Sequence, residues 1–150
     1  MKCAKEIVDI RSQANAVFEA QLTAQTLATY TTACADTITL CEESISKALE
    51  ESASRHGTEF VKISFPVYIY EDRLGNKLFK RVTETKKAYA NGGSSWHHSG
   101  DPYSLKALTE YLEQFCYAVS IREYGFRCKS WGFGDTSFPV LEITARPECE

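Results

Sequence analysis

The sequence predicts an α+β domain: a long N-terminal helix, or a helix pair, followed by a β-hairpin, a helix and a second β-hairpin. Three observations predict this fold. Residues 1–56 contain neither glycine nor proline, whereas most later segments contain one. Residues 59–70 alternate between apolar and polar side chains. Residues 103–124 repeat apolar side chains at helical spacing. The four strands should form a mainly antiparallel sheet with helix on one face.

The composition is that of an ordinary globular protein. With 150 residues, 43% hydrophobic and 25% charged, the chain should form one domain, with residues 1–56 as its helical segment and residues 57–150 as its ββαββ segment. No apolar run approaches the roughly 18 residues of a membrane span, and the first residues are polar and acidic rather than typical of a signal peptide. We therefore expect a cytoplasmic protein without membrane contact.

The six cysteines do not indicate a metal or redox site. They are scattered along the chain without the close pairs of a Cys-x-x-Cys motif. We expect mostly buried, free thiols, and no metal ion or other cofactor. The cysteines are Cys3, Cys34, Cys41, Cys116, Cys128 and Cys149.

The N-terminal segment contains an apolar row at heptad spacing, which is typical of a helix that meets another helix. The residues expected to mediate self-association are Val17, Ala24, Leu27, Thr31 and Ile38. A second ridge that includes Ala14 and Phe18 widens the stripe, so the N-terminal half should pack on two sides. One unbroken helix would be about 75 Å long and would protrude from a body of about 30 Å. A protruding apolar stripe predicts a homo-oligomer with coiled-coil contacts.

The alternative is a break between Thr29 and Asp36. Threonines lower helix propensity there, and Asp36 can cap a new helix. Two helices would fold back on the sheet, and the protein would then be a monomer. In both versions the helical segment should end at Gly57, which suits the left-handed position after a helix.

The first hairpin carries a cluster of basic residues. Its first strand, Glu59–Tyr70, contains Pro66, and a turn over residues 71–76 leads to a second strand, Lys77–Ala90. The basic residues of the second strand are Lys77, Lys80, Arg81, Lys86 and Lys87. They could bind a phosphate backbone, or they could protect an exposed sheet edge from pairing with a neighbour. We favour protection of an edge.

Residues 91–101 have the composition of a flexible loop and contain Trp96, His97 and His98. The two histidines and Asp101 could serve a metal-dependent hydrolase, although adjacent residues rarely converge on one ion. A contact loop anchored by Trp96 is the interpretation that we favour, because tryptophan is enriched at the centre of protein interfaces.

The second helix should begin at an Asp101-Pro102 cap and cover Tyr103–Tyr124, with Gly125 beyond its end. Residues Phe126–Phe133 and Phe138–Arg146 should form the second hairpin.

The sequence contains no specific catalytic motif. The first hypothesis is therefore a non-catalytic protein that binds another protein and self-associates, as an assembly component, an adaptor or a small inhibitor of the kind that phages and mobile elements encode. The second is nucleic-acid binding through the basic hairpin, residues 77–89. The third is a metal-dependent hydrolase that uses residues 96–101.

Overall fold

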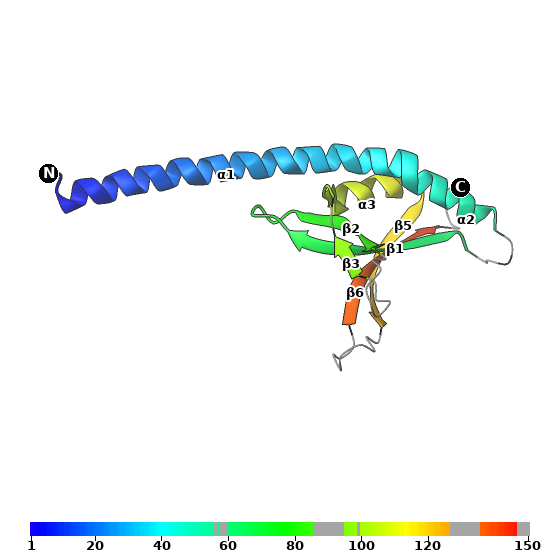
Figure 1. Cartoon of the computed structure of the whole chain (residues 1–150). Helices are drawn as coiled ribbons and strands as arrows, with labels where there is room; N and C mark the ends of the chain where they lie inside the picture. Colours follow the sequence, from blue (N-terminus) through cyan, green and yellow to red (C-terminus); the bar gives the residue numbers. More distant parts are fainter. Residues whose placement is uncertain (56, 58–59, 86–94, 99, 127–135, 147–150) are drawn as a thin grey trace.

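The computed structural model describes residues 1–150 except 56, 58–59, 86–94, 99, 127–135 and 147–150. Helix and strand follow one another in the α+β order that the sequence predicts (Figure 1). The elements are α1 (Ala4–Leu40), the π-helical turn η1 (Cys41–Ile45), α2 (Ser46–Ala53), β1 (Lys62–Glu71), β2 (Lys77–Thr85), β3 (Ser95–His98), β4 (Tyr103–Ser104), α3 (Leu105–Gln114), β5 (Tyr117–Phe126) and β6 (Thr136–Ala145).

Helix α1 runs without interruption into η1 and α2, so the alternative of a break between Thr29 and Asp36 is wrong. The threonines are accommodated because their hydroxyl groups donate to carbonyl oxygens one turn earlier. The Thr31 hydroxyl donates to the Leu27 oxygen at 2.9 Å, and the Thr37 hydroxyl donates to the Ala33 oxygen at 2.6 Å. The long helix of the sequence prediction is therefore confirmed.

Helix α3 is shorter than predicted at both ends. Its N-cap is Ser104, whose hydroxyl accepts a hydrogen bond from the Ala107 amide at 3.2 Å, so the Asp101-Pro102 cap is wrong. The helix ends before Cys116, which has a left-handed φ of 66°. Residues 117–126 then form β5 rather than helix. The position of Val119 fits both the apolar repeat of a helix and the apolar–polar alternation of a strand. Pairing of this segment with β6 stabilises the strand.

The strands form one sheet in the order β3-β2-β1-β6-β5, and β4 also pairs with β2. All pairs are antiparallel. Strand β1 is central: residues 62–66 pair with β6, and residues 67–71 pair with β2. Pro66 lies at this changeover. Because β1 divides its length between two partners, the β1–β2 and β6–β5 pairs leave this strand in different directions (Figure 1).

Two predictions about the strands are wrong. Strand β2 lies between β1 and the pair β3 and β4, so its basic residues do not occupy an exposed edge. Residues 95–98, predicted as part of a loop, form β3 and pair with residues 82–85 of β2. The predicted strand Phe126–Phe133 falls mainly on residues 127–135, outside the described residues, whereas the predicted strand Phe138–Arg146 corresponds to β6.

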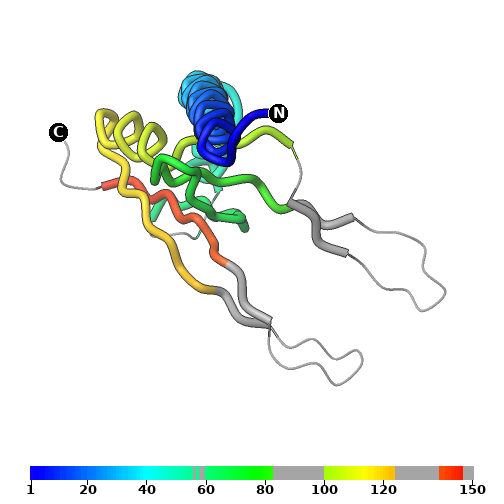
Figure 2. Tube along the Cα trace, turned by 90° about the vertical axis from the view of Figure 1, so that its left-hand side faces the viewer, coloured from blue at the N-terminus to red at the C-terminus, as the bar shows by residue number. Residues whose placement is uncertain are grey.

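One face of the sheet packs against the helices and forms the core. Alternate residues of the central strands point to this face because side chains alternate along a strand. The buried core residues are Leu40, Cys41, Ile45, Leu49, Val67, Phe79, Leu108, Leu112, Leu141 and Ile143. Helix α3 and the long helix lie side by side on this face of the sheet (Figure 2).

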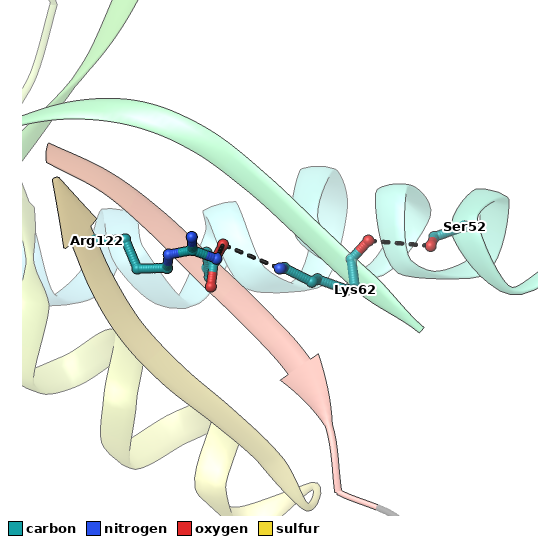
Figure 3. A network of polar contacts seen from close by, with 4 residues as sticks. Ser52, Lys62 and Arg122 are labelled. Carbon is teal, nitrogen blue, oxygen red and sulfur yellow. Dashed lines mark hydrogen bonds and ion pairs between the residues drawn. The ribbon is translucent and has the colours of Figure 1, made fainter. Parts of the chain in front are cut away.

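Polar contacts also attach the long helix to the rest of the fold. The fully buried Thr37 hydroxyl accepts a hydrogen bond from the Ser104 amide at 2.8 Å. In α2, the Ser52 hydroxyl donates to the Lys62 carbonyl oxygen at 3.1 Å (Figure 3). On the other face of the sheet, the Lys62 and Arg122 side chains both reach a carboxylate oxygen of Glu142, at 3.0 and 3.1 Å.

Candidate interaction site

The N-terminal half of α1 projects from the body of the protein (Figure 1). Every residue from Met1 to Gln21 is exposed, and α1 has its first half-buried residue at Leu22. Six large apolar side chains of α1 are between 46% and 60% exposed. They are Ile7, Val8, Ile10, Val17, Phe18 and Leu27. So much exposed apolar surface on one element is typical of an interaction site.

Part of this apolar surface forms a continuous stripe on one side of α1. Residues 7, 10, 14 and 17 follow the alternating three- and four-residue spacing of a coiled-coil seam. At 3.6 residues per turn, Val17 and the buried Ala33 lie about 160° apart around the helix axis. The stripe therefore faces away from the side of α1 that packs on the body. We call residues Ile7, Ile10, Ala14, Val17 and Ala24 the seam.

A single ion pair connects the seam region with the body in the described part of the chain. Arg73, in the turn after β1, pairs with Glu19, and both side chains are about half exposed. Exposed ion pairs contribute only about 0–1 kcal/mol. This contact therefore orients the projecting helix without covering its apolar side chains.

The predicted self-association residues are mostly accessible. Val17, Ala24, Leu27 and Thr31 are exposed, and Ile38 is half-buried at the end of α1 that packs on the body. The sequence predicts that the N-terminal half packs on two sides. Within this chain Ala14, Val17 and Phe18 are exposed, and the second ridge is half-buried only further along, at Leu22 and Tyr30. The predicted set omits Ile7 and Val8. The spacing from Ile7 through Ala14 to Val17 continues the heptad spacing and could have added Ile7 from the sequence alone.

The basic residues of the first hairpin do not form one surface. In β2, Lys77 and Arg81 belong to one face and Lys80 to the other, because successive residues alternate. The Lys80 ammonium lies 6.0 Å from the centroid of Tyr70, and the Arg81 guanidinium lies 5.3 Å from that of Phe65. Each of these two cations therefore makes a cation–π contact with an aromatic ring of the same chain. The predicted basic residues Lys86 and Lys87 lie outside the described residues.

The backbone of Trp96, His97 and His98 belongs to β3, opposite Glu84, Thr83 and Val82. Their side chains lie outside the described part of the structure. Among the residues that the structure describes, no group of three or more His, Cys, Asp or Glu side chains is placed to hold a metal ion.

A second candidate site is an apolar groove between the helices and the end of the sheet. Its volume is about 560 Å³, within the roughly 300–1,000 Å³ of ligand pockets. The groove lies along η1, and π-helical turns are frequent at functional sites. Its lining includes Ile45 and Leu49 from the long helix, Tyr111 and Phe115 from α3, Tyr117 from β5 and Val61 before β1. We call it the η1 groove.

The η1 groove is electronegative. Glu42 and Glu50 line it, and its lining includes no lysine or arginine. Burial, and then the charge of Glu42, raise the pKa of the Cys41 thiol to about 11. Burial and the neighbouring Glu42 also raise the pKa of the Tyr111 hydroxyl. Neither α2 nor α3 has a basic residue in its last turn to offset the negative end of its dipole.

The cysteines agree with the sequence prediction only in part. Cys3, Cys34 and Cys41 are free, and only Cys41 of these is buried. Cys116 is disulfide-bonded, so the expectation of free thiols is wrong for this residue.

None of the helices in the described residues has the length and apolar content needed to cross a membrane. No protein-family model, curated protein or solved structure matches this chain. A function must therefore be inferred from the geometry of the molecule.

Proposed function

We propose that this protein is non-catalytic, that it self-associates through the seam of α1, and that its α+β body binds another protein. The observation that carries the proposal is the row of large apolar side chains, about half exposed, along the projecting half of α1. Within one chain nothing in the described structure covers them. The protein would serve as an assembly component, an adaptor or a small inhibitor.

The energetics support a partner for the projecting helix. Most helices in proteins take their stability from tertiary packing of an apolar face rather than from helix propensity. Fully burying one Val, Leu, Ile or Phe side chain contributes roughly 1.5–3 kcal/mol. Several such side chains from each chain can therefore offset the cost of association.

The proposal includes the cytoplasmic location expected from the sequence. The disulfide at Cys116 counts against this location, because such bonds are rare in reducing compartments. The location therefore needs its own measurement, separate from that of self-association.

The test is the mass in solution of the whole chain, measured by size-exclusion chromatography with light scattering. The wild type should form a dimer or a larger species, whereas Val17→Asp with Phe18→Asp should run as a monomer near 16.9 kDa. Val17 belongs to the seam and Phe18 is the exposed apolar residue next to it, so charges at these two positions oppose association strongly. Ser12→Asp is the matched control, because Ser12 is exposed on another side of α1. It should keep the wild-type mass.

A wild-type monomer at every concentration would overturn the proposal. So would equal masses for the wild type and the double variant. Loss of mass in both the double variant and the Ser12→Asp control would assign the effect to added charge rather than to the seam.

A further inference from the structure

The η1 groove has the chemistry of a site for a basic, apolar helix end. Its floor is apolar and includes Phe115, which is 58% exposed. Its acidic residues Glu42 and Glu50 are exposed. The C-terminal ends of α2 and α3 add negative dipole charge, since Ala53 and Phe115 both line the groove. Its occupant should therefore combine positive charge with large apolar side chains.

The tip of α1 has the complementary chemistry. Lys2 and Lys5 are exposed there, beside Ile7 and Val8, which are 53% and 60% exposed. A carboxylate oxygen of Glu6 accepts a hydrogen bond from the Cys3 amide at 2.8 Å, so this acid caps the helix. The N-terminal end of the helix dipole adds partial positive charge. The tip is therefore an apolar helix end with Lys2 and Lys5 at its start; its acids are Glu6 and, one turn further on, the exposed Asp9.

We propose that the tip of α1 from one copy of this chain docks in the η1 groove of a second copy, with Lys2 and Lys5 facing Glu42 and Glu50. Ile7 and Val8 then cover the exposed ring of Phe115. This docking rests on the proposed self-association and adds a second contact to it. Ile7 belongs to both the seam and the tip, and the other seam residues lie closer to the middle of α1.

The contact must join two different chains. The tip and the η1 groove lie at opposite ends of one long helix, about 60 Å apart at 1.5 Å per residue, and the helix does not fold back on itself (Figure 1). If the docking is reciprocal, two antiparallel copies form a two-fold dimer; if it is not, the contact is heterologous and produces a closed ring or an open filament. In a filament, the repeat along the helix direction should be about 60 Å.

A charge exchange tests the docking with the whole chain. The tip variant carries Lys2→Glu and Lys5→Glu, and the groove variant carries Glu42→Lys and Glu50→Lys. All four residues are exposed, so neither variant should fail to fold. The mass of each is measured by light scattering at low and high salt, alone and in an equimolar mixture.

Each variant alone should lose the largest species of the wild type, because tip and groove then carry the same charge. The mixture should recover that species, since tips of one variant then meet grooves of opposite charge. A chain with all four substitutions should recover it as well. High salt should weaken the contact, because the charges are solvent-exposed.

Wild-type mass in both single-site variants, or a mixture that behaves like its separate components, would overturn the docking. Such results leave self-association through the seam intact if Val17→Asp with Phe18→Asp still yields a monomer. Conversely, recovery in the mixture together with an unchanged mass for that seam variant would support the docking and overturn the seam.

Discussion

The two halves of α1 both contain apolar side chains at helical spacing, but their environments are opposite. In the half near η1, Ala33, Thr37 and Leu40 are buried against the body. In the projecting half, Val17 and Phe18 are 59% and 57% exposed. The difference shows that a continuous helix can take its stability from one end while its other end remains available for contact.

The largest difference between the halves should be in stability. Leu40→Ala, at the end of α1 that packs in the core, should lower the free energy of unfolding by about 2–5 kcal/mol, because Leu40 is only 6% exposed. Leu27→Ala, the same change at a side chain that is 52% exposed, should alter it by no more than about 0.5 kcal/mol.

Urea unfolding followed by circular dichroism measures both changes, at a concentration low enough to keep the protein dissociated. Equal losses in the two variants would mean that Leu27 is packed in solution and that the halves do not differ.

The thiols provide a chemical measure of the same difference. Cys3 is exposed in the projecting half, whereas Cys41 is buried and its pKa is raised to about 11. A rise of about two pKa units lowers the thiolate fraction about a hundredfold near pH 8. Alkylation with iodoacetamide at about pH 8, mapped by mass spectrometry, should therefore label Cys3 long before Cys41.

Alkylation in guanidinium chloride is the control, because unfolding removes the burial that protects Cys41. Both residues should then react at similar rates. Equal rates in the folded protein would contradict the burial of Cys41.

A smaller effect should follow from one hydrogen bond. Thr37→Val keeps the shape of the side chain but leaves the buried Ser104 amide without its acceptor. An unpaired buried donor costs about 1–3 kcal/mol. Thr31→Val is the matched control, because the exposed Thr31 hydroxyl bonds only within its own helix among the described contacts. Thermal unfolding of both variants compares them, and equal midpoints would show that the Ser104 contact does not anchor α1.

The sequence predicts those parts of the fold that depend on local pattern. The long helix follows from a segment without glycine or proline, and β1 follows from its clean alternation. The prediction fails where two patterns overlap. Tyr117 and Val119 fit a continued helix as well as a strand, and the left-handed Cys116 that separates them from α3 is not a residue type that signals such a turn.

Of the two candidate sites, one can be predicted from local sequence pattern and the other cannot. Heptad spacing alone predicts Val17 and Leu27 as contact residues of α1, and both are exposed on the folded chain. The η1 groove cannot be read from the sequence, because Glu42, Phe115 and Val61 come from distant segments that only the tertiary fold brings together. For the same reason, the sequence does not show that Lys80 and Arg81 lie on opposite faces beside aromatic rings.

The division of β1 at Pro66 has a consequence for cooperativity. The β1–β2 hairpin and the β6–β5 pair share this single strand, each through a different half of it. The ladder between residues 62–66 of β1 and residues 140–144 of β6 therefore connects one hairpin directly with the other. Beyond this ladder, each hairpin can open and close as a separate unit of local unfolding while the helices hold the shared strand in place.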